Sequence, residues 1–355
     1  MKKIFKYLGT LCVALILVLV IKKLNSNSKQ QIFEFKFEGV VLNGILNLPK
    51  NQEPKGIILL LHGSGRTNAV AQNKYSDVRK IMVDAGYATY MWDKKGCGKS
   101  GGTFDINQTI NNSALEAIAA INVLKENKIP GYNQIGLYGG SLAGWINPTI
   151  INQYEGIAFW ISVSGGDDKE NFSYHLGENL RIDGVRNDSI NLVVNQWLKG
   201  IKIAHSGGSY EEYMNATQAL QNNKFWSRFV KQNYGELSEE VYTGFQKPLM
   251  KRKLDPETGL PINIDNFEEL LSSVNIPVLA LFGEKDMNID WRKTKSLYEK
   301  TIGVHGDLTV VSFPDCNHSI QECETGGFHE FQDNIFPPER CDGFLSAIEN
   351  WLKNI

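Results

Sequence analysis

Short apolar runs alternate with longer amphipathic stretches along most of this chain. The first two runs, 32–37 and 40–48, are separated by Glu38-Gly39, which predicts a β-hairpin. Continuous apolar runs, typical of strands buried on both faces, follow at 57–61, 88–92, 135–138, 157–163, 277–282 and 308–313. Helical patterns lie between most of them, at about 75–85, 108–127, up to 153, 290–301 and 341–352. This alternation predicts an α/β fold with a mostly parallel, doubly wound sheet.

A stretch from about residue 170 to about 265 interrupts the alternation. It has helical patterns and many aromatic residues, so we expect a helical cap inserted into one α/β domain that spans 31–355. Most of the aromatic side chains should form the core of the insertion itself, and some should line a pocket beneath it. They are Trp197, Tyr210, Tyr213, Phe225, Trp226, Phe229, Tyr234 and Tyr242.

Residues 1–30 differ from the rest of the chain. Lysines at positions 2, 3 and 6 precede an apolar run over 7–21, and Lys22-Lys23 and a polar linker follow it. This pattern is typical of a secretory signal or a membrane anchor. An uncleaved anchor is favoured, because no small-x-small cleavage site follows the run and no lipoprotein-type small residue precedes Cys12. As in other bacterial-type chains, we expect the domain to lie outside the cytoplasm, on the periplasmic or extracellular side.

Composition narrows the range of partners. The net charge of the 355 residues is −2, and no basic field indicates a nucleic-acid partner. No Cys/His spacing resembles a zinc site, and we expect neither a metal nor a cofactor. Three of the five cysteines, Cys316, Cys323 and Cys341, lie close in sequence. One bridge among them would fit an exported domain, but free thiols are favoured.

A glycine-flanked serine follows the run at 135–138. Residues 135–144 (Ile-Gly-Leu-Tyr-Gly-Gly-Ser-Leu-Ala-Gly) predict a buried strand, a sharp turn and the start of a helix. Such a turn exposes the Ser141 hydroxyl at the end of the strand. The usual pattern has glycine two residues after the serine, whereas here Ala143 stands there and Gly144 follows. Ser141 is therefore a candidate nucleophile.

A serine nucleophile needs a base, and the base needs an orienting carboxylate. In a parallel sheet, reactive groups gather beyond the carboxyl ends of the strands. Asp286 follows the strand at 277–282, and His318 follows the strand at 308–313. The chain order Ser141, Asp286, His318 is the order that this architecture requires.

Other histidines and carboxylates fit these roles less well. His62 is better suited to shaping a loop, His305 precedes a strand, and His175 and His205 lie in the insertion, while His329 stays a possible base. Asp290, Asp167 and Asp168 stay alternatives for the acid; a helix cap or a solvated charge is the simpler role for each of these carboxylates.

Acyl transfer also needs donors for the developing oxyanion. The backbone N–H of Leu142, at the start of a helix, can supply one. The other should come from the turn His62-Gly63-Ser64-Gly65, with the N–H of Ser64 as first choice and that of Gly65 as the alternative.

A second glycine-rich stretch resembles a phosphate-binding loop. Residues 96–100 are Gly-Cys-Gly-Lys-Ser, but Asp93 stands where that motif begins with glycine, and its carboxylate would repel phosphate. Gly101-Gly102 disfavour the helix that should follow the lysine. We therefore expect a tight structural loop beside the serine turn.

Taken together, these motifs resemble the α/β-hydrolase superfamily. The segments that carry the resemblance are 62–65, 92–101, the serine turn and the loops of Asp286 and His318. Residues 93–100 look like the Asp-x-Arg-Gly-x-Gly-x-Ser signature of its esterase and serine-aminopeptidase-like branches, with Lys95 in place of the arginine. His-Gly-Ser-Gly is similar to the bacterial esterase D-type branch. The resemblance covers about 32–165 and 270–352 and implies a Ser-His-Asp triad.

These observations favour a serine hydrolase that cleaves small acyl esters through an acyl-enzyme intermediate. A serine peptidase acting on short peptides is the alternative. It would need carboxylates for the substrate terminus, and Glu211-Glu212 and Glu239-Glu240 are candidates, although solvated helix faces are the simpler interpretation. A second alternative is a non-catalytic, membrane-tethered binding module with the same fold.

Overall fold

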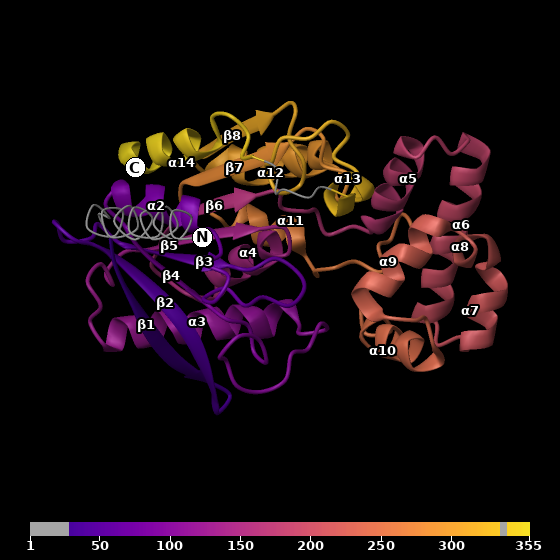
Figure 1. Ribbon diagram of the computed structural model, residues 1–355, viewed down its shortest axis with the longest axis horizontal. Helices are drawn as coiled ribbons and strands as arrows, with labels where there is room; N and C mark the ends of the chain where they lie inside the picture. The colour runs from indigo at the N-terminus through magenta and orange to yellow at the C-terminus, as the bar shows by residue number, and fades with distance from the viewer. Residues whose placement is uncertain (1–27, 334–338) are drawn as a thin grey trace, which may run out of the picture.

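The computed structural model describes residues 28–333 and 339–355, and within them the chain forms one eight-stranded sheet (Figure 1). The strand order across the sheet is β1-β2-β4-β3-β5-β6-β7-β8. The strands are β1 (Ser28–Phe37), β2 (Val40–Pro49), β3 (Ile57–Leu61), β4 (Ala88–Trp92), β5 (Ile135–Gly140), β6 (Ile157–Val163), β7 (Val278–Gly283) and β8 (Leu308–Phe313).

The predicted hairpin and the mostly parallel sheet are both confirmed. β1 pairs with β2 and β2 with β4 in antiparallel fashion, while all pairs from β4–β3 to β7–β8 are parallel. Every residue of β3 and of β4 is buried. These strands lie inside the sheet with helices on both faces, which explains their unbroken apolar sequence.

Two layers of helices cover the sheet. The core on one face includes side chains of α3 (Ile110–Glu126), α4 (Ala143–Gln153), α11 (Phe267–Ser272) and α12 (Trp291–His305). The core on the other face includes α2 (Ser76–Asp84) and α14 (Phe344–Asn354). Residues of β3 alternate between the two cores, because successive side chains of a strand point to opposite faces. All of these helices except α11 lie near predicted positions, with ends that shift by a few residues; α11 was not predicted.

Between β6 and α11 the chain forms a separate group of helices, which we call the cap (Figure 1). It has its own hydrophobic core, as its aromatic content predicts: Trp197, Tyr213, Phe225, Trp226 and Tyr242 are buried there. Tyr234 is an exception, with 47% of its surface exposed. The cap consists of α5 (Phe172–Ile182), α6 (Asn187–His205), α7 (Tyr210–Ala216), α8 (Gln218–Gln221), α9 (Lys224–Tyr234) and α10 (Glu239–Leu249).

A second helix that was not predicted is the short α13 (Phe328–Asp333), near the C-terminus. Its first residue, Phe328, packs against the core of the cap and contacts the ring of Phe225 at 5.4 Å between centroids. The loop after β8 therefore reaches across to the cap.

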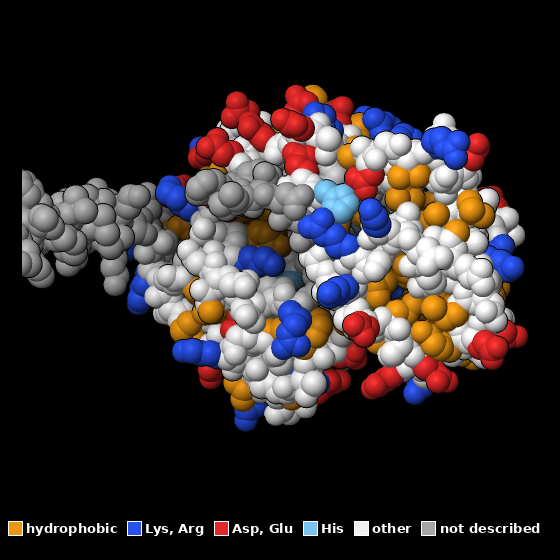
Figure 2. Space-filling model, turned by 45° about the vertical axis from the view of Figure 1, so that its right-hand side comes forward, with side chains coloured by type: hydrophobic (Ala, Val, Ile, Leu, Met, Phe, Trp, Pro, Cys, Tyr) orange, Lys and Arg blue, Asp and Glu red, His pale blue; other side chains and the backbone are white. Residues whose placement is uncertain are grey.

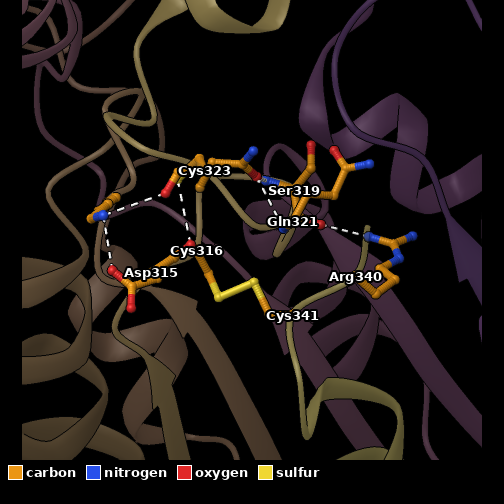
Figure 3. Close-up of a disulfide and its surroundings, with 9 residues drawn as sticks. Asp315, Cys316, Ser319, Gln321, Cys323, Arg340 and Cys341 are labelled. Atoms are coloured by element: carbon orange, nitrogen blue, oxygen red, sulfur yellow. Dashed lines mark hydrogen bonds and ion pairs between the residues drawn. A yellow bond between two sulfur atoms is a disulfide. The ribbon is translucent and has the colours of Figure 1, made fainter. Parts of the chain in front are cut away.

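A disulfide joins Cys316 to Cys341 and links the loop after β8 to the segment before α14 (Figure 3). The expectation of free thiols is wrong for these two cysteines. They are 25 residues apart in sequence, and the chain returns to within 6.2 Å between their Cα atoms. Cys323 is a free thiol, as is the buried Cys97.

The expected anchor or signal segment lies almost entirely outside the described residues, which begin at Ser28 as the first residue of β1. In the part of the chain that is described, no helix has the length and apolar character needed to cross a membrane.

Candidate active site

Ser141 lies in a sharp turn between β5 and α4. Its φ is +56°, in the left-handed region that costs a residue with a Cβ some strain. The turn is so compact that a Cβ added to Gly139 would collide with the Cβ of Ala143. Position 144 also requires glycine, because an added Cβ there would lie only 2.8 Å from the Cα of Gly165. Ala143 thus fills the space that Gly139 leaves open, which explains why the turn tolerates alanine there.

The carboxyl ends of the central strands lie in one row. Gly140 pairs with Val163, Val163 with Leu281, and Leu281 with Val311. The N–H of Ser141 donates to the carbonyl of Val163 at 3.0 Å, which ties the turn to the neighbouring strand. The loops that follow β5, β7 and β8 therefore start from the same edge of the sheet.

Asp286 and His318 meet at this edge. His318 Nδ1 lies 2.7 Å from Asp286 Oδ2, and the Asp286 side chain is fully buried. The other carboxylate oxygen accepts backbone N–H groups of Asn288 at 2.8 Å and Ile289 at 3.1 Å. These bonds hold the carboxylate in place and leave Nε2 of His318 as the ring nitrogen available for chemistry.

Burial of His318 disfavours its charged form, but the charge and hydrogen bond of Asp286 outweigh burial and raise the pKa of His318 above its ordinary value. About 15% of the His318 side-chain surface stays exposed. The Ser141 hydroxyl makes no hydrogen bond to His318 or to any other residue within 28–333 and 339–355. Such bonds are often long in a free enzyme and shorten when substrate binds.

The competing residues have other partners. Asp290 caps α12 by accepting the N–H of Arg292 at 3.3 Å, and Asp167 accepts the side-chain amide of Asn171 at 2.9 Å. His329 contacts Asp183 at 3.2 Å, and His175 is hydrogen-bonded to the carbonyl of Met287.

The turn at 62–65 packs directly on the serine turn. A Cβ on Gly63 would lie 3.5 Å from the Cβ of Ser141. Neither the N–H of Ser64 nor that of Leu142 has an acceptor among the described residues. Both N–H groups are therefore available to an incoming oxygen.

Two polar side chains hold this turn, and sequence reasoning found only one of them. His62 donates to the carbonyl of Trp92, and burial, reinforced by the charge of Lys94, lowers the pKa of His62 to about 3. It is therefore neutral and structural, as its position predicts. Lys94, the residue missed, donates to the carbonyls of Gly63 at 2.6 Å and Gly65 at 2.9 Å, on either side of Ser64. No local pattern indicates this role, because the two segments are about thirty positions apart.

The glycine-rich stretch at 96–100 is a structural loop. Asp93 is fully buried, and its carboxylate accepts the N–H of Val70 at 2.8 Å, the side-chain amide of Asn43 at 2.8 Å and the N–H of Lys99 at 3.1 Å. An added Cβ on Gly98 would collide with that carboxylate. Arg66 donates to the carbonyl of Gly96 at 2.8 Å, so an arginine still contacts the loop although Lys95 replaces the usual one.

Comparison with known proteins agrees with this architecture. A family model described as "Serine aminopeptidase, S33" matches residues 52–166. An esterase of Pyrococcus furiosus superposes with a TM-score of 0.51 and 17% identity, covering 92% of this chain and 91% of that one. A proline iminopeptidase of Mycobacterium smegmatis superposes with a TM-score of 0.54 and 15% identity, covering 91% and 98%. No curated protein matches the chain.

The chain therefore has the α/β-hydrolase fold. In this fold the turn from a central strand to the following helix lies at the carboxyl edge of the sheet, and Ser141 lies in such a turn here. Within residues 28–333 and 339–355, no group of three or more His, Cys, Asp or Glu side chains is placed to hold a metal ion.

A cleft of about 710 Å³ opens beside the serine turn, between the sheet and the cap. Ser64 and Leu142 line it, as do the apolar side chains of Trp92, Trp145 and Ile146. The cap contributes residues from the end of α10 and the segment after it. Figure 2 shows Lys and Arg side chains gathered around a hollow in the surface.

The cap also contacts the loop after β7 that carries Asp286, through helix α5. The hydroxyl of Tyr174, on α5, donates to the carbonyl of Asp286 at 3.0 Å, and His175 is bonded to the next carbonyl. The sequence places His175 in the insertion but carries no signal for these contacts, because the Tyr174–Asp286 bond joins residues 112 positions apart.

Proposed function

We propose that this α/β-hydrolase is a serine hydrolase that cleaves carboxylic esters, with Ser141 as nucleophile, His318 as base and Asp286 as orienting acid. The observation that carries the proposal is the hydrogen bond of 2.7 Å between His318 and Asp286, at the sheet edge where Ser141 occupies a left-handed turn. The family model supports a serine hydrolase without choosing between an ester and a peptide, and the esterase of similar fold is compatible with an ester.

The reaction follows from these positions. Ser141 Oγ bonds to the substrate carbonyl carbon while its proton passes to Nε2 of His318. The N–H groups of Leu142 and Ser64 bind the oxygen that becomes negative. The carbon–oxygen bond to the alcohol then breaks, and the alcohol leaves with the proton from His318. A water molecule attacks the acyl-enzyme by the same route, which releases the acid and restores Ser141.

An ester fits this site better than the free amino terminus of a peptide. The acidic pairs that a peptidase would use do not line the cleft. Glu212 is the capping residue of α7 and accepts the N–H of Ser209 at 2.6 Å, while Glu239 and Glu240 lie in the first turn of α10. The cleft carries an excess of cations, which would repel an ammonium group.

Labelling with a fluorophosphonate probe tests the proposal. The wild-type protein should be labelled, and Ser141→Ala should not. Ser164→Ala is a matched control, because Ser164 follows the neighbouring strand β6, also has a positive φ of +48°, and is buried. Equal labelling of Ser141→Ala, or no labelling of the wild type, would refute the enzyme and favour a non-catalytic binding module.

We also propose that the domain is tethered to a membrane by residues 1–30 and lies outside the cytoplasm. The Cys316–Cys341 disulfide supports this location, because disulfides persist mainly in oxidising compartments. A fused reporter that is active only outside the cytoplasm should give signal. A silent reporter would reverse the proposed orientation.

A further inference from the structure

The cleft beside Ser141 has an unusual charge balance. Five cationic residues line it, Lys94, Lys95, Lys247, Lys251 and Arg252, against three acidic ones, Asp105, Glu116 and Asp265. Two of the acids are already engaged within the protein. Asp265 pairs with Lys253 at 2.9 Å, and Glu116 accepts the indole N–H of Trp92 at 2.6 Å. Two of the cations are engaged as well, because Lys95 pairs with Glu38 at 3.4 Å and Lys94 donates to the carbonyls of Gly63 and Gly65. The other three, Lys247, Lys251 and Arg252, are the cations that a ligand could neutralise.

Three of the cations come from one short stretch of the cap. Lys247 lies in the last turn of α10, and Lys251 and Arg252 follow that helix. None of the three forms an ion pair with any residue in the described part of the chain. The guanidinium of Arg252 donates to the side-chain oxygen of Asn263 at 2.9 Å, which fixes it over the cleft. Arg252 is exposed, and the desolvation of its guanidinium lowers its pKa with no carboxylate partner to offset the effect.

Apolar side chains also line the cleft. Trp92, Trp145 and Ile146 line it on the side of the sheet, close to the oxyanion donors. A ligand in the cleft would thus contact both apolar side chains and the cations at the end of α10. This arrangement suits a molecule with an apolar segment and an anionic end.

We propose that the substrate is a carboxylic ester that carries a second, ionised carboxylate, separated from the ester bond by an apolar segment and bound by Lys247, Lys251 and Arg252. This inference rests on the proposed function and specifies its substrate class. Arginine favours a carboxylate because its planar fork can donate two parallel hydrogen bonds.

Paired substrates test the proposal. On the acyl side, p-nitrophenyl monoesters of dicarboxylic acids of increasing chain length are compared with p-nitrophenyl esters of neutral acids of the same length. On the alcohol side, 4-acetoxybenzoate is compared with phenyl acetate. The wild type should show kcat/KM at least about tenfold higher for the anionic member of one pair, with the advantage shrinking as salt is added. No preference in either arm would overturn the proposal.

Charge variants of the cap assign the preference to these residues. Lys251→Gln and Arg252→Gln should each reduce the anionic preference about three- to fivefold, since one partly exposed ion pair is lost. Lys251→Glu should reduce the anionic preference further, because the introduced carboxylate repels the carboxylate of the substrate. Lys199→Gln removes the same charge from an exposed site on α6 outside the cleft and should leave the preference unchanged. A preference that survives Lys251→Glu would overturn the assignment.

Two further measurements separate this proposal from the enzymatic one. Hydrolysis of neutral esters by the wild type and not by Ser141→Ala would establish the hydrolase even if no anionic preference exists. In the Ser141→Ala protein, calorimetry with adipate should detect binding that Lys251→Glu weakens. The absence of binding together with the absence of preference would refute the anionic substrate alone.

Discussion

Backbone geometry and buried hydrogen bonds hold the candidate catalytic groups at the edge of the sheet. The cations of the cap, in contrast, lie on an exposed stretch at the end of α10. Asp286 is fully buried and accepts three hydrogen bonds, but Lys247 and Lys251 have no ion-pair partner among the described residues. Rigidly held groups keep the geometry that the reaction needs, whereas exposed side chains around the cleft influence which substrate binds. Substitutions at the edge should therefore affect every substrate, and those in the cap should affect ratios between substrates.

Removing the base should have the largest effect. His318→Ala should lower kcat on the order of 10⁴-fold for neutral and anionic esters alike, because nothing then takes the proton of Ser141. Stopped assays of ester hydrolysis measure this loss of kcat. His329→Ala is the control, since His329 contacts Asp183 and lies beyond the catalytic loop. If His329→Ala were the inactive variant, the base would be assigned to the wrong histidine.

Replacing the acid should have a smaller effect with a diagnostic pH dependence. Asp286→Asn should lower kcat by about 10³-fold. Asp286 raises the pKa of His318 against the effect of burial, and the base must be neutral to act. Without the carboxylate this pKa falls, so the acidic limb of the kcat/KM profile should move to lower pH.

Asp290→Asn is the matched control, because Asp290 only caps α12. It should keep both kcat and the position of the acidic limb. An unmoved limb in Asp286→Asn would show that another group sets the pKa of the base.

What could be predicted from the sequence depends on whether a contact is local or joins segments that are distant in the chain. Continuous stretches of sequence form the turn around Ser141 and the strand ends before Asp286 and His318. Hydrophobic periodicity and turn residues therefore predict them. Lys94 reaches the carbonyls of Gly63 and Gly65 across the sheet edge, and Tyr174 reaches Asp286 from the cap. Such contacts exist only once segments distant in sequence are packed together, and one sequence carries no signal for that packing.

Loosening the cap core should affect stability more than chemistry. Phe225 is buried among aromatic rings of α9, α5 and α13, and Phe225→Ala should lower the free energy of unfolding of the cap by about 3–5 kcal/mol. Urea unfolding followed by tryptophan fluorescence measures it, since Trp197 and Trp226 lie in this core.

Tyr234→Ala, on the same helix but 47% exposed, should cost far less. Fluorophosphonate labelling of Phe225→Ala under folding conditions should stay near the wild-type rate. A loss of labelling as complete as in Ser141→Ala would mean that the cap takes part in the chemistry, which would remove the distinction between the two regions.

The smallest expected effect comes from the covalent link at the edge of the sheet. The disulfide Cys316–Cys341 closes a loop that contains His318 and ties it to the segment before α14 (Figure 3). A bridge over this sequence separation restricts the unfolded chain, so Cys316→Ser with Cys341→Ser should lower the free energy of unfolding by about 3 kcal/mol. The catalytic edge would also lose a constraint two residues from the base, and kcat should fall severalfold for all esters with no change in the anionic preference. Cys323→Ser, which changes a free thiol in the same loop, should alter neither quantity. If the double variant changed substrate preference instead of kcat, the loop would act on the cleft rather than on His318.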